Sequence, residues 1–396
     1  MSDAGDGGTV RLTARASALA QRGHPWFYRD DLATGDVPHG ALVRLADDAG
    51  RDLGLAFSSQ TSKLALRRCG PWPGDGVPEL VPFLEARLRA AVARRASRLG
   101  PEDGVRLVHG ESDDLPGLVL DRYGPALVAQ VTSPALEPRL DALAPFLLAL
   151  AGCEALVARN DVAVRKLEGL PQEVRLVAGP RIEALEIREH GVRHPVLPFR
   201  GHKTGFYLDQ EPARGRVRAL ARGRRVLDLF SYQGAFALCA LAGGAASALA
   251  ADQDEEALAR AAAAAERNGL AGLTTRRANV FELLRELREG EQQFDLVVLD
   301  PPPFARSRRE RPGAERGYRD LNRLALRLLA PGGWLVTASC SHHVALPAFE
   351  DLVRQSAAGL RFKILLRQRL GAGDDHPVWL ALPESEYLKV LLLERA

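Results

Sequence analysis

The C-terminal half of the sequence predicts an α/β fold built on a doubly wound, seven-stranded sheet. From Arg225 onward, short apolar runs alternate with stretches of helical periodicity. Each parallel strand needs a crossover helix before the next, so this alternation is typical of such sheets. Polar residues directly follow several of the runs, where the binding edge of an open sheet would lie. The expected strands are Val226–Phe230, Ala248–Ala251, Thr274–Ala278, Leu296–Leu299, Trp334–Ala338, Phe362–Leu366 and Leu388–Leu393.

Two smaller domains are expected before this sheet, because 396 residues exceed what one core usually holds. Residues 1–72 contain short β-like runs and turns and predict a small β-rich domain. Residues 73–190 predict a central α+β domain, with an amphipathic helix over Leu80–Leu99 and another near Leu140–Leu150. The α/β domain then covers residues 191–396, and we expect a hairpin near residues 200–210.

Composition narrows the class of protein. A net charge of +3 excludes a polycation, so any nucleic-acid surface must be local. The four cysteines form no CxxC motif, which argues against a structural zinc site or a disulfide framework. The uncharged run over residues 230–251 is interrupted by glycines and predicts helix, turn and strand rather than a membrane span. We therefore expect a reduced, cytoplasmic protein without a membrane partner or a bound metal.

The turn after the first strand indicates the cofactor. Asp228 to Gly234 keeps the spacing acid-x-Gly-x-Gly-x-Gly, but Phe230 and Tyr232 replace the first two glycines. Glycines in such a turn let backbone amides approach a pyrophosphate, so their loss argues against a dinucleotide. S-adenosylmethionine has no phosphate, and Asp228 could face its amino group. A nicotinamide cofactor is the weaker alternative.

Later strand ends extend this constellation. Asp252 ends the second strand, where an acid can accept both hydroxyls of a ribose. Asn279 and Val280 end the third, where a polar group could meet the adenine edge. Any one of these residues could simply cap a helix, and only their order on successive strands is specific. The predicted cofactor contacts are Gln210, Asp228, Phe230, Ser231, Tyr232, Gly234, Asp252, Gln253, Asn279, Val280 and Asp300.

The chemistry is indicated by Asp300 and Cys340, which follow two further strands. A carboxylate, a stiff Pro301–Pro303 turn and a thiol at one sheet edge suggest covalent chemistry on a planar, nitrogen-containing ring. The alternative role for a cysteine is purely structural, as a small apolar residue buried in the core. That explanation suits Cys239, within the helix after the cofactor turn, better than Cys340.

Motifs along nearly the full length resemble the cytosine-5 large-subunit ribosomal RNA methyltransferases that carry an N-terminal PUA domain. The matching segments are Gly23–Trp26, Gly110–Asp121, Lys203–Gln210, Asp228–Phe236, Asp300–Phe304, Ser339–His342, Asp375–Pro377 and Glu386–Lys389. The resemblance implies a PUA domain, a central α+β domain and a Rossmann-like class I methyltransferase domain. It also implies S-adenosylmethionine as cofactor, large-subunit ribosomal RNA as partner, and a homodimer as a plausible state.

In such an enzyme Cys340 would add to carbon 6 of cytosine, so that carbon 5 can attack the methyl sulfonium. Asp300 would hydrogen-bond the base or protonate ring nitrogen 3. Pro303 is a departure, because a Lys is common there in the family and related enzymes place a second cysteine there. The base that removes the carbon 5 proton is therefore unassigned. The predicted substrate contacts are Lys203, Phe206, Pro301, Phe304 and Arg306.

Two alternatives stay open. The Asp300–Phe304 turn also resembles the Asp/Asn-Pro-Pro-aromatic turn of exocyclic amino methylation, which needs no thiol. A non-catalytic RNA-binding assembly factor is the other. RNA contacts are expected from the arginines of residues 306–323 and from Trp26, Phe27 and Tyr28, although both groups also suit ordinary solvated or core positions.

Overall fold

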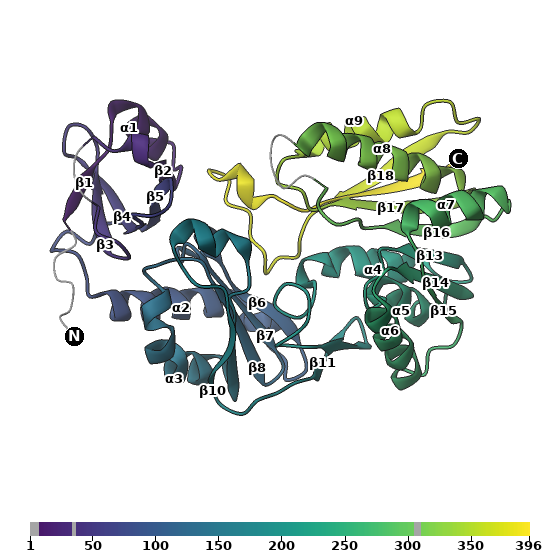
Figure 1. Ribbon diagram of the computed structural model, residues 1–396, viewed down its shortest axis with the longest axis horizontal. Coiled ribbons are helices and arrows are strands. Elements are labelled where there is room, and N and C mark those ends of the chain that lie inside the picture. The colour runs from purple at the N-terminus through teal and green to yellow at the C-terminus, as the bar shows by residue number, and fades with distance from the viewer. Residues whose placement is uncertain (1–7, 34–36, 305–309) are drawn as a thin grey trace. The chain divides into compact units, whose positions relative to one another are not determined.

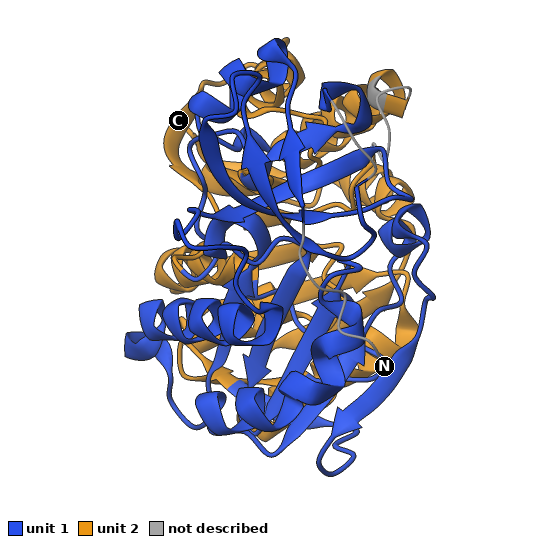
Figure 2. Ribbon diagram, turned by 90° about the vertical axis from the view of Figure 1, so that its left-hand side faces the viewer, with its two compact units in different colours: residues 1–187, 196–208, 375–385 blue, residues 188–195, 209–374, 386–396 orange. Residues whose placement is uncertain are grey.

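The computed structural model describes residues 8–33, 37–304 and 310–396. By its contacts the chain divides into two compact units, which Figure 2 colours separately. Unit 1 comprises residues 1–187, 196–208 and 375–385, and unit 2 comprises residues 188–195, 209–374 and 386–396. The chain therefore returns to unit 1 in a short segment just before its last strand.

The N-terminal part of unit 1 is a five-stranded sheet in the order β1-β3-β4-β5-β2. Its apolar side chains, among them Leu12, Phe27 and Leu45, form a core of their own. Its elements are β1 (Thr9–Arg11), α1 (Ala14–Gln21), β2 (Trp26–Tyr28), β3 (Leu42–Ala46), β4 (Asp52–Ser58) and β5 (Leu64–Gly70).

The rest of unit 1 is a second five-stranded sheet in the order β10-β9-β8-β7-β6, packed against α2 and α3. The two expected helices are present, and α2 ends at Arg94. This part contains buried ion pairs, including Arg106 with Asp121 and Arg95 with Asp113. Its elements are α2 (Leu80–Arg94), β6 (Gly104–His109), β7 (Leu118–Tyr123), β8 (Ala126–Val131), α3 (Leu140–Ala151), β9 (Ala155–Arg159) and β10 (Val174–Ala178).

Unit 2 is the predicted doubly wound, seven-stranded sheet, with all seven expected strands present. Their order is β15-β14-β13-β16-β17-β19-β18. The first five strands are parallel, while β19 runs antiparallel to both of its neighbours. The strands are β13 (Arg225–Leu229), β14 (Ser247–Asp252), β15 (Leu273–Arg277), β16 (Phe294–Leu299), β17 (Leu329–Ser339), β18 (Ile364–Leu370) and β19 (Lys389–Arg395).

Helices cover both faces of this sheet, as Figure 1 shows, with α7–α9 on one face and α4–α6 on the other. Successive strand residues point to opposite faces, so Leu227 packs against α7–α9 while Val226 packs against α4–α6. Both faces need apolar side chains, which explains the continuous apolar runs in the sequence. The helices are α4 (Glu211–Leu220), α5 (Ala235–Ala242), α6 (Glu255–Arg267), α7 (Val280–Glu289), α8 (Arg311–Arg327) and α9 (Leu346–Ser356).

The prediction of a hairpin near residues 200–210 is wrong, because this segment consists of turns followed by a 3-10 turn over Leu208–Gln210. Lys203 and Gly205 both have positive φ, which interrupts an extended backbone. The hairpin lies earlier, in β11 (Leu185–Glu189) and β12 (Val192–Val196). The division into three domains at residues 72 and 190 stays a prediction.

Among the described residues, no helix is long and apolar enough to cross a membrane.

Candidate functional site

The carboxyl ends of four parallel strands in unit 2 define the site. β13 lies between β14 and β16, and β17 follows β16, all parallel and nearly in register. Strand order reverses at β13, where the chain steps out to β14 on one side and to β16 on the other. Ligands of open α/β sheets bind beside such a reversal, outside the strands' carboxyl ends.

Asp228 lies within β13 and is 1% exposed. Its Oδ2 accepts a hydrogen bond from the backbone N–H of Ala237 at 3.0 Å. Among the described residues, Oδ1 has no hydrogen-bond partner. Burial, together with the charges of Asp300 and Asp252, raises the pKa of this carboxyl to about 8. A buried acid with one unsatisfied oxygen is suited to a cationic ligand group.

The turn after β13 keeps the backbone of a glycine turn without its first two glycines. Phe230 and Tyr232 have φ of 58° and 49°, in the left-handed region. Such a conformation costs a non-glycine residue on the order of 1 kcal/mol and is typically retained at functional sites. Gly234 has φ 70°, and a Cβ there would lie 2.9 Å from that of Ala261. Gly234 is therefore the position of this turn where both the backbone conformation and the lack of room for a side chain require a glycine.

Asp252, at the end of β14, is held by two backbone N–H groups. Tyr232 N donates to its Oδ2 at 2.8 Å, and Asp254 N donates to its Oδ1 at 3.0 Å. These bonds fix the carboxylate at the sheet edge, with part of its surface accessible. An oriented acid in this position suits a pair of ribose hydroxyls.

Gln210 connects the start of α4 to the end of β16. Its Nε2 donates to Asp300 Oδ2 at 2.9 Å. Gln210 is buried, and within the described ranges its Oε1 lacks a hydrogen-bond partner, as does the Oγ of buried Ser231. Together with Asp228 Oδ1, these are three buried polar atoms ready for a ligand. These oxygen atoms can accept hydrogen bonds from S-adenosylmethionine, which carries an ammonium, a sulfonium and a ribose.

The remaining predicted cofactor residues are placed differently. Gln253 is exposed just after β14. Asn279 caps α7, where its Oδ1 accepts from Phe281 N at 3.0 Å. The side chain of Val280 is buried in the core beneath that helix. Any contact from Val280 to a ligand would therefore come from its backbone.

Cys340 follows the last residue of β17 and is half-buried. Its strand neighbours the one that Asp300 follows, and Leu299 pairs with Thr337. Burial raises the pKa of the Tyr318 hydroxyl in α8, and the charges of Cys340 and Asp300 act in the same direction. Tyr318 therefore lies near both groups. Its hydroxyl accepts a hydrogen bond from Ser339 Oγ at 3.0 Å. The thiol and carboxylate are thus brought to one sheet edge.

The proline turn flanks the same edge. Pro301 is buried and Phe304 half-buried, and the Phe304 ring meets that of Tyr318 edge-on at 5.0 Å. Arg306 lies outside the described residues. Lys203 and Phe206 belong to unit 1, where Phe206 is buried and its backbone N–H donates to the Tyr123 hydroxyl.

Lys389, the first residue of β19, was not predicted as a functional residue. It is 3% exposed, and its Nζ donates to the carbonyl oxygens of Ser341 and Tyr387, both at 2.7 Å. Burial lowers its pKa to about 8, while the charges of Cys340 and Glu386 oppose that change. A lysine within the apolar run of residues 388–393 was a visible signal in the sequence.

The other cysteines are less suited to nucleophilic chemistry, because burial raises the pKa of each thiol. Cys239 is buried within α5, as expected, and groups with His194 and Glu189 in a geometry that could hold a metal. Arg214 already donates to both oxygens of Glu189. A cation would have to displace that guanidinium, so the cluster is better explained as a buried ion pair.

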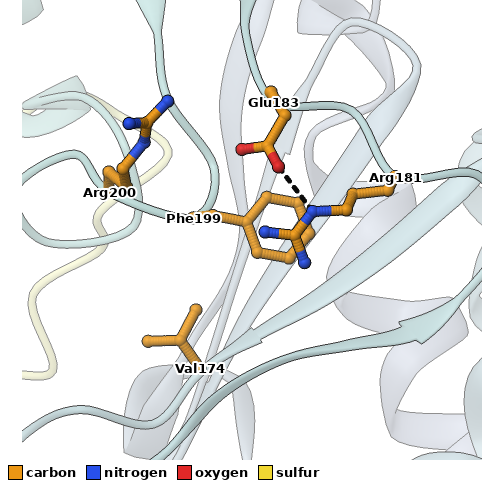
Figure 3. Close-up of a pocket in the computed structure, with 5 residues that line it drawn as sticks. All are labelled: Val174, Arg181, Glu183, Phe199 and Arg200. Atoms are coloured by element: carbon orange, nitrogen blue, oxygen red, sulfur yellow. Dashed lines mark hydrogen bonds and ion pairs between the residues drawn. The ribbon is translucent and has the colours of Figure 1, made fainter.

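Figure 3 shows a pocket in unit 1. It is lined by Val174, Arg181, Glu183, Phe199 and Arg200. The Arg181 guanidinium stacks 4.1 Å from the centre of the Phe199 ring and pairs with Glu183. The pocket contains none of the predicted site residues.

Fold and site together define a class I S-adenosylmethionine-dependent methyltransferase. Residues 112–375 match the S-adenosylmethionine-dependent methyltransferase family, and residues 10–69 match the PUA-like domain. The chain belongs to this methyltransferase family and carries a PUA-like domain near its N-terminus.

Curated relatives match 96% of the chain. "Ribosomal RNA large subunit methyltransferase I" from Photobacterium profundum is 39% identical over 391 residues, which is 96% of each chain. The protein of the same name from Erwinia tasmaniensis is 38% identical and covers 96% of this chain and 98% of its own.

Solved structures share the whole architecture. A methyltransferase complexed with SAH aligns with a TM-score of 0.84 and 22% identity, covering 98% of this chain and 99% of its own. A SAM-dependent methyltransferase from Streptococcus mutans aligns over the same shares with a TM-score of 0.81 and 22% identity. At this identity the alignments establish the fold.

Proposed function

We propose that this methyltransferase modifies carbon 5 of a cytosine in large-subunit ribosomal RNA, through a covalent bond between Cys340 and carbon 6. The observation that carries the proposal is the position of a half-buried thiol one strand away from Asp300, at the cofactor edge of the sheet. Methylation of an exocyclic amine would need no nucleophile there.

The residues at this edge of the sheet have separate roles in cofactor binding and in catalysis. Asp228, Gln210 and Asp252 hold the cofactor through its cationic and ribose groups, and the bound cofactor supplies an electrophilic methyl group. Cys340 adds to carbon 6 and makes carbon 5 nucleophilic, as in other covalent catalysis. Asp300, held by Gln210, hydrogen-bonds the cytosine and supports protonation of ring nitrogen 3.

Ribosomal RNA as substrate is supported by the curated relatives, whose names state that activity. A PUA-like domain and exposed basic side chains on α8, such as Arg316, suit an RNA partner. In the N-terminal sheet, Phe27 is buried in the core, whereas Tyr28 is 50% exposed and free to stack on a base. An RNA substrate and reduced cysteines are consistent with a cytoplasmic enzyme.

The test uses the full-length protein, large-subunit RNA from cells lacking it, and S-adenosylmethionine. Cys340→Ala should abolish turnover while cofactor affinity stays within about twofold, because Cys340 lies outside the cofactor contacts. Cys239→Ala is the matched control and should keep activity. RNA containing 5-fluorocytosine should trap a covalent adduct with the wild type and none with Cys340→Ala.

Mass spectrometry of the modified nucleoside separates the alternatives. Methyl on the exocyclic nitrogen, with Cys340→Ala active, would establish the amino-methylation alternative. Tight RNA binding without methylation in the presence of cofactor would indicate an assembly factor.

A further inference from the structure

We propose that Lys389 is the charge partner of Cys340, taking up the thiol proton so that Cys340 attacks as a thiolate. The inference rests on the proposed function and deepens it, because it assigns the ionisation of the nucleophile to a residue of a different strand. Lys389 acts through Cys340 and is therefore a positioning residue.

The sheet brings the two residues together. β19 runs antiparallel to β17, and Lys389 pairs directly with Ser339, the residue before Cys340. The Lys389 side chain extends past Ser339, and its Nζ donates a hydrogen bond to the carbonyl of Ser341, the residue after Cys340. Nζ is thus held at the backbone carbonyl of the residue that directly follows the thiol.

The hydrogen bonds of Lys389 suit a group that alternates between two protonation states. Its bonds to the carbonyls of Ser341 and Tyr387 use two N–H groups. A neutral amine has two N–H groups and a lone pair, so it can keep both bonds and accept a proton. An ammonium keeps both bonds and has a third N–H for an anion.

Burial makes an anion necessary when Lys389 is charged, since an uncompensated buried ammonium is unfavourable. Two acidic groups affect its pKa, Cys340 and Glu386. Glu386 is exposed, so solvent and salt screen its charge. Cys340 is half-buried and directly precedes Ser341, whose carbonyl accepts a hydrogen bond from Lys389. Cys340 is therefore the better counter-ion. Other titratable groups near the pair include Tyr318, Asp300, His342 and Tyr387, and Asp209, which accepts a hydrogen bond from the Tyr387 hydroxyl.

The proton balance closes over one turnover. The S–H bond breaks, its proton joins the Lys389 amine, and the sulfur electron pair forms the bond to carbon 6. Carbon 5 then uses the π pair of the C5–C6 double bond to take the methyl group, whose former bonding pair stays with the sulfur of the leaving thioether, and solvent or another base removes the carbon 5 proton. The electrons of that C–H bond re-form the ring double bond, and the pair of the C6–S bond returns to sulfur. The thiolate and the Lys389 ammonium are restored, so Lys389 is not the base for carbon 5.

The test measures the ionisation of Cys340 in the RNA-free protein by the pH dependence of its alkylation with iodoacetamide. The other three thiols have raised pKa values, so the fast phase at neutral pH reports on Cys340, and Cys340→Ala identifies it by removing that phase. In the wild type we expect this thiol to titrate below the ordinary cysteine value of about 8.5.

Lys389→Met should raise the titration midpoint of Cys340 by at least about one pH unit and slow alkylation at pH 7 about tenfold. Methylation should fall similarly at pH 7 and recover partly at pH 9. Lys389→Arg, which keeps a cation, should restore most of the low midpoint. Lys363→Met is the control, because exposed Lys363 precedes β18 at the opposite end of its pairing with β19.

A wild-type midpoint at or above 8.5 overturns the inference without any variant, as does an unchanged alkylation profile in Lys389→Met that has lost activity. The second result would assign Lys389 a purely structural role in bridging two carbonyls. A midpoint that depends on Lys389, in a protein that does not methylate carbon 5, would instead refute the proposed function alone.

Discussion

The buried carboxyl of Asp228 should make the cofactor-free protein less stable as pH rises, and Asp228→Asn should remove this effect. Its pKa is about 8, against 3.8 for an ordinary aspartate. The folded state therefore binds a proton that the unfolded state has already lost between these values. Stability falls across this range of pH, which is the sign expected for a raised carboxyl pKa.

The magnitude follows from the same two values. At 1.36 kcal/mol per pH unit, keeping Asp228 ionised at pH 8 costs up to about 5 kcal/mol. The amide oxygen of Asn can still accept the bond from Ala237 N. Asp228→Asn should therefore stabilise the protein at pH 8, and a gain of only about 2 kcal/mol raises Tm by roughly 4–8 °C. The gain should shrink steadily towards pH 5.

Thermal unfolding of wild type and variant between pH 5 and pH 9 tests the stability, with exposed Asp320→Asn as control. Calorimetry tests the function: wild-type affinity for S-adenosylmethionine should weaken below pH 8, because the cationic ligand must displace the proton. Asp228→Asn should bind at least tenfold more weakly and without this pH dependence. A stabilisation of equal size at pH 5 and pH 8 would refute the reasoning.

Two further changes probe the same edge of the sheet. Gln210→Leu removes the hydrogen bond that holds Asp300 and should lower kcat about tenfold, whereas an unchanged kcat on RNA would mean that Asp300 needs no such support. Gly234→Ala places a Cβ 2.9 Å from that of Ala261 at φ 70°, so we expect a loss of about 1–3 kcal/mol in chemical denaturation and weaker cofactor binding. Wild-type stability of that variant would show that the turn relaxes freely.

Strong periodic signals made the catalytic domain predictable. Continuous apolar runs that contain Asp228, or that Asp252 or Asp300 directly follows, can hardly be anything but buried strands that bring a polar residue to the sheet edge. The retained order of these acids also identified the cofactor, and the comparisons agree with it. The hairpin near residue 205 failed because positive φ at Lys203 and Gly205 leaves no trace in apolar patterning.

Local sequence alone determined the fold class, the strand ends and the residue types available there, because these depend on periodicity within some ten residues. Only the tertiary structure decided which of them meet. It paired Lys389 with Ser339 beside Cys340, joined Gln210 to Asp300, and left Asp228 with an unsatisfied oxygen in the described structure. Sheet order sets these contacts, and sheet order is fixed by the packing of distant segments, which no local pattern records.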